Sequence, residues 1–174
     1  NGLSDNMAGG ANYNYDTKKT KISSSYYFSQ TKLRTESLGE VTNFIPLGDL
    51  NTTTSANQFN RNNSHRVSFR VEKELDTLNS LVFVNNSRYN TTDALRLSNR
   101  DIRRIVNTTT QPTTASRTNN SSNGQSFGMA NSLIYKHKFR KKGRSFAASA
   151  TYQINTSDGD LELNSRTQFF QATS

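Results

Sequence analysis

The segment Ser145-Phe146-Ala147-Ala148-Ser149-Ala150-Thr151-Tyr152-Gln153-Ile154 decides the fold class, because its side chains change character at every step. Successive side chains of a β-strand point to opposite sides of the sheet. One face of the predicted strand then carries Phe146, Ala148, Ala150, Tyr152 and Ile154. The other face carries Ala147, Ser149, Thr151 and Gln153. We therefore predict a strand with one apolar and one polar face.

The same alternation recurs upstream. Before this segment, Leu133, Tyr135 and Phe139 alternate with polar residues, and His137 falls among the apolar set. Val67, Phe69 and Val71 oppose Arg66, Ser68, Arg70 and Glu72. Weaker alternation follows at Leu81, Phe83 and Tyr89, where Val82 and Val84 blur the pattern, and near the start at Tyr13, Tyr15, Ile22, Tyr26 and Phe28.

Three charged turns separate these runs, at residues 16–19, 75–79 and 140–144. Each turn has alternating runs on both sides, which is the pattern of a β-hairpin. The sequence thus predicts an all-β, antiparallel up-and-down sheet, with the three charged turns at one end.

Two long polar stretches, residues 36–63 and 94–125, are rich in Asn, Thr and Ser. A compact soluble domain rarely contains loops of that size. Outer-membrane barrels have short periplasmic turns and long extracellular loops. We predict that these stretches are mainly such loops, with parts that extend the strands; residues 101–106 suit either a short strand or a helix.

The composition agrees with a wall that is apolar on one face only. Hydrophobic residues make up 31% of the 174 residues, against about 45–50% in typical soluble domains, and the mean hydropathy is −0.83. Seven Tyr and ten Phe argue against a disordered chain. A soluble sandwich with one solvated face gives the same alternation, and the contrast of short turns with long polar stretches favours the barrel.

Residues 62–72, 75–83 and 133–145 resemble the outer-membrane β-barrel family of Bacteroidetes that is related to TonB-dependent receptors. The resemblance covers roughly residues 9–170. It implies a large barrel of about 22 strands with an N-terminal plug. On this interpretation residues 1–174 are a partial barrel of about six or seven strands, without the plug and the other N-terminal domains. The chain opens without a signal peptide, which we attribute to missing N-terminal sequence.

The resemblance also implies the partners and the location. They are outer-membrane lipid, the remainder of the barrel with its plug, and a TonB-type energy-transducing system reached through the missing N-terminal part, all in the bacterial outer membrane. Candidate lipid-facing residues are Phe146, Ala148, Ala150, Tyr152, Ile154, Leu133, Tyr135, Val67, Phe69 and Val71. An open sheet would leave backbone groups unsatisfied in lipid, so we predict that residues 1–174 do not close into a barrel by themselves.

No residue pattern points to catalysis, and we expect no enzyme activity, cofactor or metal. The two histidines, His65 and His137, lack partners at ligand spacing and are expected near strand ends. The acidic segment 157–162 lacks the EF-hand pattern, so its Asp-Gly pair predicts a tight turn. The basic run from Lys136 to Arg144 contains interleaved aromatic residues, but strand alternation explains it better than nucleic-acid binding does.

The predicted function is therefore part of the wall and outer loops of a receptor-like protein for uptake or transport across the outer membrane. The alternative is a soluble or surface-attached β-sheet module for binding or adhesion.

Overall fold

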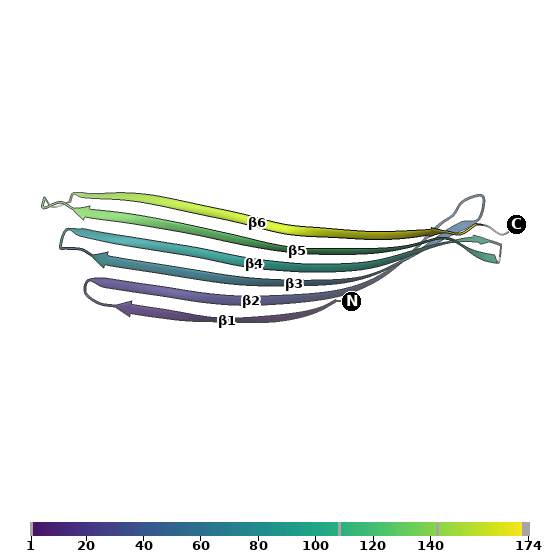
Figure 1. The fold of residues 1–174 in the computed structure, drawn as a ribbon, viewed down its shortest axis with the longest axis horizontal. Helices are drawn as coiled ribbons and strands as arrows, with labels where there is room; N and C mark the ends of the chain where they lie inside the picture. The colour runs from purple at the N-terminus through teal and green to yellow at the C-terminus, as the bar shows by residue number, and fades with distance from the viewer. Residues whose placement is uncertain (1, 108, 142, 172–174) are drawn as a thin grey trace.

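The fold is known from a computed structural model that describes residues 2–107, 109–141 and 143–171. These residues form one antiparallel sheet in which each strand pairs with the next along the chain (Figure 1). The six strands are β1 (Gly2–Asp16), β2 (Thr20–Asn43), β3 (Asp49–Glu74), β4 (Asn79–Val106), β5 (Thr109–Lys138) and β6 (Ser145–Phe169). None of the described residues is in a helix that could cross a membrane.

The sheet is open. Its strand order is β1-β2-β3-β4-β5-β6, so β1 and β6 are the two edges and do not pair with each other within the described chain. This confirms the prediction that the chain does not close on itself. Each edge strand leaves one row of backbone N–H and C=O groups without a strand partner.

The three charged turns lie at the same end of the sheet, as predicted, because they connect β1 to β2, β3 to β4 and β5 to β6 (Figure 1). In the first turn, Thr17 and Thr20 bond to each other through backbone and hydroxyl groups. In the third, the backbone N–H of Phe139 donates to the carbonyl of Arg144. Lys142, which belongs to this turn motif, lies outside the described residues.

The prediction of long polar loops is wrong. Residues 36–63 and the described part of 94–125 lie almost entirely in strands; a short connection at residues 44–48 joins β2 to β3, and β4 ends at Val106 just before β5 begins at Thr109. Residues 101–106 are the end of β4 rather than a helix. Gly48 makes the first connection possible: its φ is +106°, and a Cβ there would lie 2.7 Å from the carbonyl oxygen of Ile105.

The reason for this error is that both faces of the sheet are polar in these stretches. Opposite residues such as Thr53 and Glu40, or Ser98 and Thr118, are in regular register. Their backbone groups are satisfied by the neighbouring strand, which makes extended structure stable without an apolar face. Hydrophobic alternation, the signal used to find strands, is therefore missing.

A single layer of strands has almost no interior. Among the described residues, only Ala56 and Val82 are buried apolar side chains, and Thr52 is the buried polar one. Large apolar side chains such as Tyr152 remain exposed, with 59% of its surface accessible. The sheet is therefore held together by its strand ladders, and its apolar face has no cover within the described chain.

Candidate functional site

The strand register assigns every strand residue to one of two faces, because directly opposite residues of an antiparallel sheet share a face. All ten predicted lipid-facing residues lie on the same face. Leu133 is opposite Ala150, and Tyr135 is opposite Ala148. Val67, Phe69 and Val71 of β3 lie on the same face, because the β4 residues opposite them are themselves opposite residues of β5 on this face. Phe146, Tyr152 and Ile154 complete the set. We call this side the apolar face; Ser149, Thr151 and Gln153 lie on the opposite, polar face.

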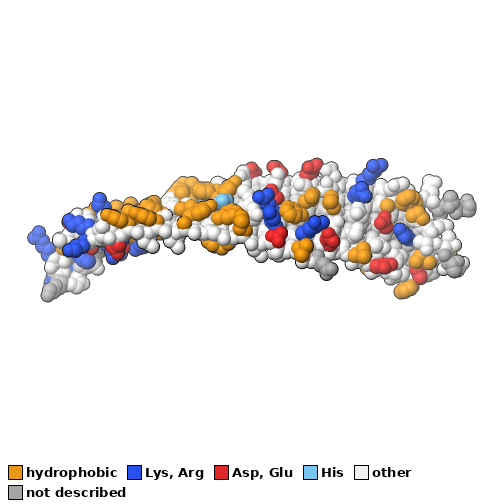
Figure 2. Space-filling view, turned by 90° about the horizontal axis from the view of Figure 1, so that it is seen from below, with side chains coloured by type: hydrophobic (Ala, Val, Ile, Leu, Met, Phe, Trp, Pro, Cys, Tyr) orange, Lys and Arg blue, Asp and Glu red, His pale blue; other side chains and the backbone are white. Residues whose placement is uncertain are grey.

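The apolar face has a continuous band near the charged turns. From the row containing Leu133 to the row containing Phe127, none of its residues is Lys, Arg, Asp or Glu. We define the apolar band by its large members: Tyr13, Tyr15, Ile22, Tyr26, Phe28, Val67, Phe69, Val71, Phe83, Tyr89, Phe127, Met129, Leu133, Tyr152 and Ile154. Figure 2 shows a group of hydrophobic side chains next to the charged end that carries the turns, and acidic, basic and hydrophobic side chains mixed over the other half of the visible surface.

Three polar side chains near the centre of this band, Asn85, Asn131 and Ser87, bond to one another. The side-chain amide of Asn85 donates to Asn131 Oδ1 at 2.6 Å. The hydroxyl of Ser87 donates to Asn85 Oδ1 at 3.1 Å. Burying a polar group without a partner costs free energy, so this arrangement suits a face that is removed from water.

The outermost row of the band, on the side away from the charged turns, contains ring side chains. Phe28, His65, Tyr89 and Phe127 are opposite one another on four successive strands. The ring centroids of Phe28 and His65 are 4.9 Å apart, and those of His65 and Tyr89 are 6.3 Å apart. His65 Nδ1 also lies 2.8 Å from the hydroxyl of Tyr26. The expectation that His65 lies near a strand end is wrong, because it lies inside β3.

The other histidine lies beside the third charged turn. His137 is near the end of β5, as expected, and its Nδ1 lies 2.7 Å from Asn79 Oδ1. The same oxygen accepts a hydrogen bond from the Tyr135 hydroxyl. Among the described residues, no group of three or more His, Cys, Asp or Glu side chains is arranged to hold a metal ion.

The acidic segment 157–162 is not a turn. It lies in the middle of β6, and the prediction of an Asp-Gly turn is wrong. Gly159 is opposite Gly124 of β5, and a Cβ at Gly159 would lie 3.0 Å from the carbonyl oxygen of Asn123. The glycine thus permits a close approach of two strands rather than a change of direction.

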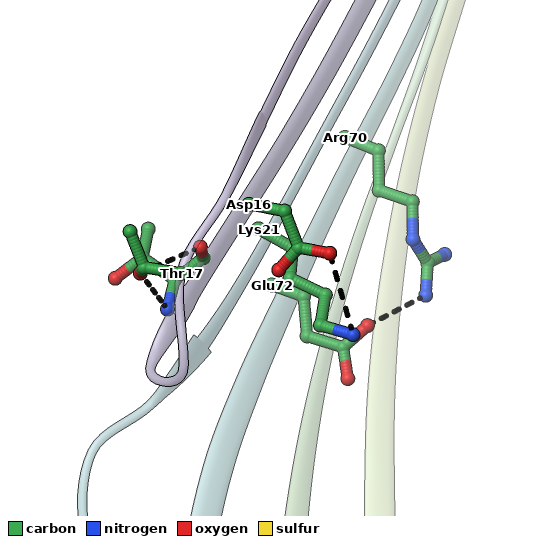
Figure 3. A network of polar contacts seen from close by, with 6 residues as sticks. Asp16, Thr17, Lys21, Arg70 and Glu72 are labelled. Carbon is green, nitrogen blue, oxygen red and sulfur yellow. Dashed lines mark hydrogen bonds and ion pairs between the residues drawn. The ribbon is translucent and has the colours of Figure 1, made fainter.

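On the polar face, carboxylates occur only near the charged turns. The strands place Asp16, Glu72 and Glu74 there, within the described chain. Asp16 lies 3.8 Å from the ammonium group of Lys21, and Glu72 lies 3.2 Å from the guanidinium group of Arg70 (Figure 3). Lys136 and Lys138 share this face through their pairing with Ala147 and Ser145.

Farther from the turns, the charged residues of the polar face are all arginines. β4 supplies Arg88, Arg96, Arg100 and Arg104, and β3 supplies Arg66. The acidic residues at this level, such as Asp93 and Asp158, lie on the apolar face beyond the ring row, together with basic residues such as Arg61 and Arg117. At this level the polar face of the described strands has arginines and no carboxylates, which gives it a positive potential.

Arg66 and Arg88 lie directly opposite each other in a hollow of about 560 Å³ on the polar face. Within the described chain, no hydrogen bond or ion pair involves either guanidinium group. The next residue across the sheet is Gly128, where a Cβ would lie 2.8 Å from Asn155 Oδ1. The hollow is also lined by Ser25, Tyr27, Ser68, Asn86, Ala130 and Gln153. The sequence alone does not reveal this arrangement, since it depends on pairing between two strands.

Comparison with known proteins establishes no family for this chain. No family model matches the chain, and none of the curated proteins does. Among solved structures, the membrane pore complex of pneumolysin aligns at 6% identity with a TM-score of 0.18. That alignment covers 95% of this chain and 31% of the pneumolysin chain, so the chain spans less than a third of the length of that protein.

Proposed function

We propose that this chain is part of the wall of a transmembrane β-barrel in a bacterial outer membrane. The observation that carries this proposal is the apolar band, which is exposed, uncharged and open on the side away from the polar face. Leu133 has 45% of its surface accessible and Val67 has 41%. Lipid would cover such a face, and water inside a barrel would suit the opposite face.

The apolar band and the next two rows toward the charged turns together fit the height of a bilayer. On β5 the face is apolar or aromatic from Phe127 to His137, apart from Asn131, and Lys73 of β3 lies at the level of Tyr135. Ten steps at about 3.3 Å span about 33 Å, and a strand tilt of about 40° reduces this height to about 25 Å. The apolar belt of outer-membrane barrels has about that height.

Aromatic residues mark both borders of the band. Phe28, Tyr89 and Phe127 lie at the outer border, and Tyr135 and Phe146 lie near the charged turns. Barrels carry aromatic girdles at both membrane interfaces. The band lies next to the charged turns, and the strands continue far beyond it at the other end. Because outer-membrane barrels are short on the periplasmic side and extended on the outside, we place the charged turns on the periplasmic side. The strands of 24 to 30 residues in β2 to β5 then extend the wall far outside the bilayer, in place of the expected loops.

The rest of the barrel must come from elsewhere, because β1 and β6 have free edges. From the sequence resemblance we propose that the missing strands belong to a receptor-like transport protein related to TonB-dependent receptors. Its plug and further strands would lie in sequence outside residues 1–174. The function is then uptake or transport across the outer membrane.

The test is the location and heat-modifiable migration of the full-length protein that contains this chain. We expect it in the outer-membrane fraction, and we expect unheated and boiled samples to migrate differently on a gel, since closed barrels resist detergent. Recovery in a soluble fraction with identical migration of both samples would favour the alternative, a soluble or surface-attached β-sheet module for binding or adhesion.

A further inference from the structure

We infer that the polar face binds an anionic solute, with Arg66 and Arg88 as the primary contact. This inference rests on the proposed function and deepens it, because it assigns a chemical class to the solute that passes the inner side of the wall. The shared chemistry is an oxyanion group, either a phosphate or a carboxylate.

Arg66 and Arg88 lie where their positive charges repel each other. Directly opposite residues have Cβ atoms about 4.5–5.5 Å apart, and like charges at that position destabilise a sheet. No carboxylate neutralises this pair: the adjacent rows on the same face hold Ser64 with Asn90 and Ser68 with Asn86. An anion between the two guanidinium groups would remove the repulsion.

The hollow offers hydrogen-bond donors and space that suit an oxyanion. Each guanidinium group presents planar pairs of N–H donors that match the two oxygens of a phosphate or carboxylate. Around the pair, neutral donors are available from the side-chain amides of Asn86 and Gln153, and the Ser68 hydroxyl donates to Asn86 Oδ1. The volume of about 560 Å³ is within the range of small-molecule sites.

Positive charge continues along β4 beyond the pair. Arg96, Arg100 and Arg104 follow Arg88 on the same face toward the outer end of the sheet. On the polar face of the described strands, no carboxylate lies at that level. These arginines would lead an anion from the outer end to the pair at Arg66 and Arg88.

The experiment uses the full-length protein purified in detergent, with inorganic pyrophosphate and citrate as probes and sucrose as the uncharged control. Calorimetric titration at low ionic strength measures binding to the wild type and to the double variant Arg66→Gln/Arg88→Gln. The matched control is Arg61→Gln, which removes one arginine from the other face of β3. Heat-modifiable migration checks that every variant is folded.

We expect the wild type to bind at least one of the two anions and not sucrose. The double variant should bind that anion roughly tenfold or more weakly, since hydrogen bonds between charged groups are lost, while Arg61→Gln should change affinity less than about twofold. Higher salt should weaken binding by the wild type. Preference for pyrophosphate or citrate identifies the phosphate or the carboxylate as the group that is recognised.

The inference is overturned if a folded wild type binds neither anion, or if the folded double variant binds as tightly as the wild type. These results would leave the proposed wall function intact, because that function depends on the migration test. Conversely, absent heat-modifiability with intact anion binding would overturn the barrel and retain the site.

Discussion

The side-chain amide of Asn79 donates a hydrogen bond of 2.6 Å to Asp76 Oδ2 and thereby ties the β3–β4 turn to the first residue of β4. The other carboxylate oxygen accepts hydrogen bonds from the backbone N–H groups of Leu78 and Asn79. The bond from the Asn79 side chain, followed by these backbone bonds, lowers the pKa of Asp76 below its ordinary value. The turn is therefore ordered around an ionised carboxylate.

This turn gives the first prediction, which is a pH dependence. Because the folded pKa of Asp76 is lowered, its stabilising contribution is present above the unfolded pKa and is lost as pH falls through the folded pKa. Asp76→Asn should lower the melting temperature at neutral pH. The difference from wild type should shrink as the pH is lowered below about 4. Thermal melts of both proteins across this range test it, and a difference that stays constant down to acid pH would contradict it.

The second prediction concerns the two faces of β6. Ala150 lies on the apolar face opposite Leu133, and its neighbour Thr151 lies on the polar face opposite Ser132. Arg on the lipid face at mid-membrane costs about 2–4 kcal/mol. Ala150→Arg should impair assembly of the full-length barrel, and Thr151→Arg should be tolerated. Heat-modifiable migration measures assembly, and equal behaviour of the two variants would reject the proposed orientation.

The third prediction concerns the amide pair in the apolar band. Asn131→Leu should destabilise the full-length protein by about 1–3 kcal/mol, because Asn85 would lose its acceptor in a water-free environment. The double variant Asn85→Leu/Asn131→Leu should recover much of that loss, since neither polar group remains. Unfolding by denaturant in detergent measures both. A double variant less stable than the single variant would show that the band is hydrated.

The fourth prediction concerns repulsion on the polar face. In the absence of added anions and at low salt, Arg88→Gln should stabilise the protein by about 0.2–1 kcal/mol, because it removes a like charge opposite Arg66. Salt should stabilise the wild type more than the variant. Melting temperatures at low and high salt test this. A loss of stability at low salt would mean that Arg88 has a favourable partner.

The sequence predicts the fold best where the environments of the two faces differ. Alternation between Phe146 and Ile154 identified β6 and its faces, and the charged turns located the hairpins. Beyond the ring row both faces are hydrophilic, so hydrophobicity no longer distinguishes a strand from a loop. There the regular strand pairing, rather than a period of two in hydropathy, determines the structure.

The arginine pair was missed for a different reason. Arg66 precedes Thr77 by eleven residues and Arg88 follows it by eleven, so the β3–β4 turn brings the two into register. Each arginine alone has the pattern of a solvated strand residue. The signal exists in the sequence, but it appears only when distances are counted symmetrically from a turn whose centre is known.

The spacing of the arginines along β4 determines how they act on a mobile ion. Arg88 and Arg96 are eight residues apart, and the next two intervals are four residues each. At about 3.3 Å per residue these intervals are about 26, 13 and 13 Å, while physiological salt screens charges beyond about 8 Å. An ion moving along β4 would therefore interact with one arginine of β4 at a time, joined by Arg66 of β3 at the level of Arg88. Its motion would be a series of short hops between separate energy minima rather than a slide through a uniform field.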